Sequence, residues 1–165
     1  MEIERAEAMI DAFYPFYPFY PDRLAPFLIA AAGSRADLLY YQGWAEGGHY
    51  EIVARSPCQW EPGDTIACPV TVRDDPVAAL GTNFNVTDTF HIVFDDDRIV
   101  AVETTSDDPP IYYQARDWVM REMPEVMKGP CKGYYAGGTT PEDCARAMTE
   151  SYRRFAKSDE LPGNT

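Results

Sequence analysis

Hydrophobic positions near the start of the chain recur at the spacing of a helix. Ile3, Ala6, Met9 and Ile10 would share one face of a helix over residues 2–14, with acidic residues on the opposite side. The first proline of the chain follows directly, and proline lacks the backbone donor that a continuing helix needs. The pattern therefore predicts an amphipathic helix that ends at this point.

A Phe-Tyr-Pro triplet then occurs three times in succession over residues 13–21. Each proline favours an extended conformation in the residue before it, so this segment is expected to be a stiff aromatic connector. A second helix is predicted over residues 22–32, with Asp22 as its N-cap and Gly33 just beyond its end.

The central part of the chain changes to short runs rich in β-branched and aromatic residues. Runs at 38–44, 49–56 and 65–73 are separated by segments containing glycine or proline, which predicts hairpin-linked antiparallel strands. The clearest pair is 83–94 with 98–105, joined by three consecutive aspartates. Alternation of apolar and polar residues in its first member predicts a hairpin.

Helical patterns return at 111–123 and 141–157, with a glycine-rich loop at 129–138 between them. Helices, then antiparallel strands, then helices is an α+β order without βαβ alternation, and the chain has neither a Walker A motif nor a dinucleotide fingerprint. We expect residues 1–128 to form one α+β domain and residues 129–165 a loop and helix packed on it.

Two segments resemble the nuclear transport factor 2-like superfamily, which includes SnoaL-like cyclases and ketosteroid isomerases. One is Asp-Arg-Leu-Ala-Pro-Phe-Leu at residues 22–28, after the first helix, and the other is the hairpin segment at 94–102. The resemblance implies N-terminal helices packed in a strongly curved antiparallel sheet, forming a cone with an apolar pocket at its open end. It also implies a homodimer formed through the outer face of the sheet, and it implies no single activity.

The chain is acidic, with 27 Asp and Glu against 14 Lys and Arg and a formal net charge of −13. A field of that sign repels phosphate backbones and anionic lipid headgroups, so neither nucleic acid nor a membrane surface is an expected partner. The acidic N-terminus is unlike the basic start of a signal peptide, and no apolar run is long enough for a spanning helix. These features predict a cytoplasmic protein.

Four cysteines are present, Cys58, Cys68, Cys131 and Cys144. Cys58 and Cys68 flank an expected turn and could pair in an oxidising compartment, but in the cytoplasm all four are expected to stay thiols. The chain has no CxxC motif and only two histidines, so no metal site is expected, and no cofactor is implied.

One carboxylate interrupts the apolar face of the best-defined strand. Period-2 alternation places on this face Phe84, Val86, Asp88, Phe90, Ile92 and Phe94. If the face lines a pocket, desolvation would raise the pKa of Asp88 and make it a general acid or base. The alternative is that Asp88 lies near a strand end or bulge and only satisfies a backbone amide or an arginine.

Few other residues are candidates for a catalytic or metal-binding role. His49 follows a glycine turn and is the second catalytic candidate, although such a histidine is more often a solvated turn residue. His91 has the opposite parity to Asp88 and should point away from it. The aspartate runs at 95–97 and 107–108 do not match a calcium loop and are interpreted as solvated turns.

Aromatic residues supply the candidate ligand contacts, although they could equally well form the core. The candidates are Tyr14, Tyr17, Tyr40, Trp44, Phe84, Phe90 and Trp118. Three functions remain open: a cofactor-independent isomerase, dehydratase or cyclase that uses Asp88, a non-catalytic binder of a small hydrophobic molecule, and a protein-interaction module.

Overall fold

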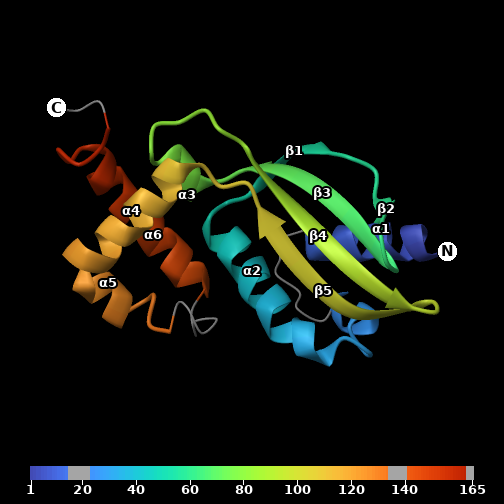
Figure 1. Cartoon of the computed structure of the whole chain (residues 1–165). Coiled ribbons are helices and arrows are strands. Elements are labelled where there is room, and N and C mark those ends of the chain that lie inside the picture. Colours follow the sequence, from blue (N-terminus) through green and yellow to red (C-terminus); the bar gives the residue numbers. More distant parts are fainter. Residues whose placement is uncertain (15–22, 134–140, 163–165) are drawn as a thin grey trace.

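The computed structural model describes residues 1–14, 23–133 and 141–162, and these residues form an α+β protein with a five-stranded antiparallel sheet (Figure 1). In chain order the elements are α1 (Glu2–Phe13), the 3-10 turns η2 (Ala25–Phe27) and η3 (Ala32–Ser34), α2 (Arg35–Gly47), β1 (Glu51–Arg55), β2 (Gln59–Glu61), β3 (Thr65–Arg73), α3 (Asp75–Ala78), β4 (Val86–Asp95), β5 (Arg98–Ser106), α4 (Pro110–Glu122), α5 (Pro124–Lys128) and α6 (Pro141–Ala156).

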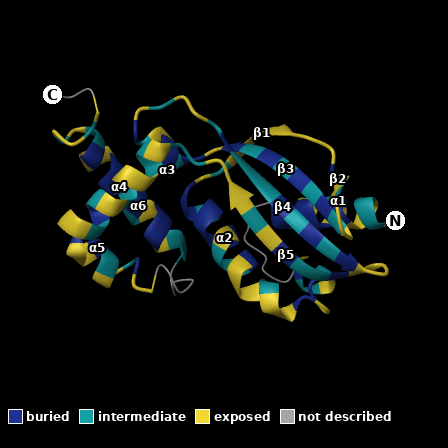
Figure 2. Ribbon diagram, viewed as in Figure 1, coloured by how far each residue is buried: buried dark blue, intermediate teal, exposed yellow. Residues whose placement is uncertain are grey.

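The sheet has the order β1-β3-β4-β5, and β2 also pairs with β3. Strands β4 and β5 form the predicted hairpin, with Asp88 paired to Ser106 and Phe90 to Thr104. Buried and less buried positions alternate along β3 and along most of β4, as the period-2 pattern predicts (Figure 2). The sheet therefore has one face on the core, and that face carries Asp88.

Helix α1 packs on the buried face of the sheet. Its apolar stripe is buried in the core, as the helical spacing predicts. The rings of Phe13 and Phe90 meet edge to face with 4.8 Å between their centroids. At the sheet edge, Arg55 of β1 donates to the carboxylates of Glu7 and Asp11, each at 2.5 Å. These contacts hold α1 against β4 through Phe13 and against β1 through Glu7 and Asp11.

The prediction of a strand at 38–44 is wrong, because this segment lies within helix α2. Leucine and tyrosine suit either structure, and the residues buried here, including Leu38, Gln42 and Ala45, follow helical spacing. The Gly47-Gly48 pair ends the helix instead of forming a hairpin turn. The next predicted strand begins only at Glu51.

The second predicted helix, at 22–32, is also not formed as an α-helix in the described residues. The structure has two short 3-10 turns, η2 and η3, and Pro26 in η2 lacks the donor that an α-helix would use. Asp22 lies outside the described residues. Short elements that the sequence did not indicate are β2, α3 and α5.

A second apolar core lies in the helical half of the molecule, beside the sheet (Figure 1). Helix α6 packs along α2 and against α3 and α4, and its buried residues include Met148, Tyr152 and Phe155. Helices α4 and α6 were predicted at nearly these bounds. In the described residues, no helix is both long and apolar enough to cross a membrane.

The expectation of four free thiols is wrong, because the cysteines form two disulfides. Cys58, directly before β2, pairs with Cys68 of β3, and Cys131 pairs with Cys144 of α6. The expectation assumed a reducing compartment, which no feature of the fold requires. The local geometry brings each pair together, with Cα atoms 4.3 Å and 4.6 Å apart.

The close approach of α2 and α6 depends on a residue without a side chain. A Cβ atom on Gly47 would lie 2.7 Å from Glu142 Cα and closer still to the Glu142 carbonyl oxygen. Gly47→Ala is therefore expected to lower the free energy of unfolding by about 1–3 kcal/mol, as other overpacking substitutions do.

Gly33→Ala is the matched control, because an added Cβ there meets no atom within 4 Å. Urea unfolding of both variants measures the difference. Equal stability of the two variants would show that α6 can move away from α2 at no cost.

Candidate functional site

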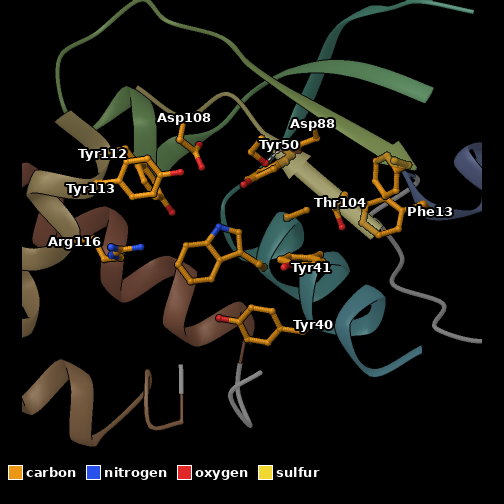
Figure 3. Close-up of a pocket in the computed structure, with 14 residues that line it drawn as sticks. Phe13, Tyr40, Tyr41, Tyr50, Asp88, Thr104, Asp108, Tyr112, Tyr113 and Arg116 are labelled. Atoms are coloured by element: carbon orange, nitrogen blue, oxygen red, sulfur yellow. Dashed lines mark hydrogen bonds between the residues drawn. The ribbon is translucent and has the colours of Figure 1, made fainter. Parts of the chain in front are cut away.

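A cavity of about 360 Å³ opens between the sheet and the helical half (Figure 3). The sheet contributes polar and apolar side chains from neighbouring strands, namely Asp88 and Phe90 of β4 and Thr104 and Ser106 of β5. These four residues form two cross-strand pairs, so the register of the β4–β5 hairpin brings them to one wall. The volume suits a small organic molecule.

Asp88 lies in this wall and is the only acidic residue on the buried face of β4. Its carboxylate accepts a hydrogen bond of 2.5 Å from the Ser106 hydroxyl, directly across the strand pair. Burial raises the pKa of Asp88 to about 6, the Ser106 hydrogen bond opposes this, and Asp108 and Asp107 add to it. A carboxyl with this pKa can exchange protons near neutral pH.

A second carboxylate, Asp108, borders the same cavity just beyond the end of β5. Burial and the neighbouring Asp107 raise its pKa to about 6, while a hydrogen bond from the Tyr113 hydroxyl and the charge of Arg116 oppose the shift. Figure 3 shows the Tyr113 hydroxyl directed toward Asp108. Asp88 and Asp108 thus provide two ionisable groups at one cavity.

Aromatic side chains form the other walls. Tyr40, Tyr41 and Trp44 project from α2, where their spacing places them toward the cavity. Tyr112 and Tyr113 project from the first turn of α4. The cavity is therefore mostly aromatic, with acidic groups on the side of the sheet.

The Tyr50 phenol lies within the electrostatic influence of several carboxylates. Its pKa is raised well above the usual value, first by burial and then by the carboxylates of Asp74, Asp88 and Asp108. The phenol therefore stays protonated and can donate a hydrogen bond into the cavity, which it lines. Such a donor next to a carboxylate near neutrality is a common arrangement for proton transfer.

The structure brings several of the predicted site residues to this cavity. Asp88, Phe90, Tyr40 and Trp44 line it, with Tyr40 and Trp44 on a helix instead of the expected strand. Tyr14 lies just behind the wall, its ring 5.8 Å from that of Phe90. Burial and then the charge of Asp88 raise the Tyr14 pKa.

Other predicted site residues lie away from the cavity. His49 is exposed on the surface, and its Nδ1 forms a 2.6 Å hydrogen bond with the Asp75 carboxylate. Phe84 precedes β4 and is exposed, and Trp118 packs on Phe155 in the second core. His91 points away from Asp88 as expected. Tyr17 lies outside the described residues.

The sequence interpretation missed the residues that follow β5. Asp108 was assigned to a solvated turn, and Tyr112, Tyr113 and Arg116 were not considered, although all four line the cavity. One signal was available, since period-2 alternation through Thr104 and Ser106 continues to Asp108. The helix residues could not be placed, because their contact with the sheet depends on how α4 packs.

Asp74 carries a buried carboxylate whose charged form destabilises the folded state. It is 4% exposed and caps α3 by accepting a hydrogen bond from the Val77 amide at 2.8 Å. Burial raises its pKa to about 7 in spite of this bond, and the charges of Asp108, Asp88 and Asp75 add to the shift. The folded state therefore binds more protons than the unfolded state between about pH 4 and 7, and stability falls as pH rises through that range.

Asp74→Asn should keep the cap and remove the charge. We expect the variant to be more stable than the wild type by roughly 1–4 kcal/mol near pH 8, with the difference vanishing near pH 4. Urea unfolding at several pH values measures this, with Asp97→Asn in the exposed β4–β5 turn as the control. A destabilised Asn variant near pH 8 would contradict the assignment.

The described part of the chain has no group of three or more His, Cys, Asp or Glu side chains placed to hold a metal ion. Comparison with protein-family models, with curated proteins and with solved structures finds no match to this chain. The function must therefore be argued from the cavity itself.

Proposed function

We propose that the cavity binds a small, largely hydrophobic molecule and that Asp88 acts on it as general acid or base, in an isomerisation, dehydration or cyclisation without a cofactor. One observation carries the proposal: a carboxyl with a pKa of about 6 lies in the wall of an aromatic cavity. A base whose pKa is close to the working pH combines a high ionised fraction with useful basicity.

The neighbouring groups support this role. Ser106 donates to one carboxylate oxygen of Asp88 and orients it, leaving the other oxygen available to take a proton from the ligand. The protonated phenol of Tyr50 lines the cavity and supplies a hydrogen-bond donor for negative charge that develops on the substrate. The aromatic walls hold the apolar body of the ligand and exclude water around the reacting atoms.

We also propose a distant relationship to the nuclear transport factor 2-like superfamily, whose pockets lie between N-terminal helices and an antiparallel sheet. The support is the packing of α1 on the sheet together with an aromatic cavity at the β4–β5 hairpin. A homodimer formed through the sheet remains part of this proposal. Light scattering of the purified protein would measure its mass in solution.

Non-catalytic binding is the second candidate function. The observation in its favour is that His49, the expected second catalytic group, lies outside the cavity, which is mainly aromatic. In that case the aromatic residues bind the ligand, and Asp88 catalyses no reaction of it.

The first experiment is native mass spectrometry of protein purified gently from its own host, followed by extraction of any retained small molecule. A bound molecule with an apolar body supports the proposal and supplies the substrate for testing turnover. A protein that retains nothing and binds no member of a library of flat apolar compounds contradicts a ligand-binding role for the cavity.

We propose that the protein works in an oxidising compartment instead of the expected cytoplasm. The support is the pair of disulfides, which persist in oxidising compartments and are rare where glutathione and thioredoxin keep thiols reduced. Alkylation of free thiols in protein taken directly from its host tests this, and four reactive thiols would contradict it.

A further inference from the structure

We propose that the ligand of this cavity is an organic cation, a protonated amine carried on a flat apolar or aromatic body. This inference rests on the proposed function, because it takes the cavity as the binding site and narrows the class of molecule that fits. Three features carry it: acidic groups without ion-pair partners, aromatic faces around them, and the charge of the whole chain.

Neither cavity carboxylate forms an ion pair within the described residues, although the charge of Arg116 acts on Asp108 from a greater distance. Asp88 accepts its hydrogen bond from a hydroxyl, that of Ser106, and takes part in no ion pair there. Asp108 accepts from the Tyr113 hydroxyl and is likewise in no ion pair there. A bound ammonium group would supply the missing positive charge, since charge-assisted hydrogen bonds to carboxylates are among the strong ones.

Arg116 is the only basic residue among the described residues that line the cavity, and its ion pair is with a third carboxylate outside the cavity lining. Its guanidinium forms an ion pair with Asp117 at 3.3 Å. It also lies 5.0 Å from the centre of the Tyr113 ring, the geometry of a cation–π contact. A cavity aromatic residue therefore already stabilises one cation, and more aromatic faces surround the space beside it.

The aromatic walls suit both parts of such a ligand. Tyr40 and Tyr41 face the acidic side across the cavity in Figure 3, and Tyr50 lies next to Asp88. Ring faces attract a cation, while their area packs against an apolar body. A neutral hydrophobic ligand would use the rings and leave each carboxylate desolvated, with a hydroxyl hydrogen bond but no bound positive charge.

The charge of the whole protein acts in the same direction. The formal net charge of −13 produces a negative potential that concentrates cations near the molecule and repels anions. An anionic ligand would have to approach against this potential and would meet two carboxylates for one arginine.

Three probes that share one ring test the charge preference: tryptamine is cationic, tryptophol neutral and indole-3-acetate anionic. Isothermal titration calorimetry near pH 7.5 should give tryptamine a Kd lower than that of tryptophol by at least about tenfold, the effect expected of a charged hydrogen bond. Indole-3-acetate should bind most weakly. Raising the salt concentration should not abolish the preference, because a partly buried pair is screened less than a surface pair.

The Asp108→Asn variant tests whether Asp108 is the group that prefers the cationic probe. The variant should lose at least about tenfold in tryptamine affinity and keep its tryptophol affinity, since only the charge has been removed. Asp97→Asn, an equal loss of charge in the exposed β4–β5 turn, should leave both affinities unchanged. Thermal unfolding of each variant verifies that the fold is retained.

Each outcome decides between the possibilities. Tryptophol binding as tightly as tryptamine would overturn the cation inference and leave the proposed hydrophobic cavity standing. Tighter binding of indole-3-acetate would overturn it in favour of Arg116 as the anchor. No binding of any probe at millimolar concentration would also overturn it, and the library screen described above would then decide whether the cavity binds ligands at all.

Discussion

Replacing Asp88 by asparagine is expected to lower kcat for the cavity ligand by about 100-fold or more, the usual contribution of a positioned general acid or base. Asparagine has nearly the same shape and can still accept the Ser106 hydrogen bond, so the cavity should keep its form. The change removes the group that gains and loses the proton. Turnover of the extracted ligand, measured by mass spectrometry, tests this expectation.

The pH dependence of kcat/KM provides a second test of the role of Asp88. If Asp88 acts as a base, kcat/KM should rise with pH through the pKa of about 6, because only the ionised carboxylate accepts a proton. Ser106→Ala removes the hydrogen bond that lowers this pKa, so the rise should move to higher pH. A purely structural role of Ser106 would change the rate without moving the profile.

Asp97→Asn provides the control for general effects of charge, since Asp97 is exposed in the β4–β5 turn. Equal turnover in the wild type and Asp88→Asn would exclude Asp88 as the proton-transfer group. Tight binding of the ligand without turnover in either protein would establish the non-catalytic alternative.

Loss of the two disulfides should have the largest effect on stability. They close segments with sequence separations of 10 and 13 residues, and cross-links of this size stabilise by about 3 kcal/mol each. Together they amount to a large share of the roughly 5–15 kcal/mol that stabilises a typical domain. Reduction with dithiothreitol should therefore lower the urea midpoint markedly.

Two double variants separate the contributions. Cys58→Ser with Cys68→Ser loosens the connection in front of the β2–β3 hairpin, where both sulfurs belong to the sheet core. Cys131→Ser with Cys144→Ser loosens the attachment of α6 in the helical core. An oxidised wild-type protein whose urea midpoint does not change on reduction would contradict a stabilising role for either bridge.

The parts of the fold that the sequence determined are those in which local pattern and final environment agree. The β4–β5 hairpin alternates apolar and polar residues and turns at consecutive aspartates, so its pairing follows from its own residues. Helices α1, α4 and α6 carry apolar stripes at helical spacing, and α4 and α6 begin at prolines. The sequence also predicts that Asp88 is a candidate site residue, because period-2 alternation places it on the apolar face of its strand.

The tertiary structure decided what local pattern left ambiguous. The segment at 38–44 suits a strand or a helix, and in the fold it is helix α2, on which Gly43 and Gly47 leave room for the close approach of α6. The cavity likewise depends on packing, which brings α2, the β4–β5 hairpin and α4 together across more than seventy residues of sequence from Tyr40 to Arg116. Asp108 and Tyr113 gain their importance only there, since burial and proximity, which no local pattern encodes, set the pKa of a carboxylate.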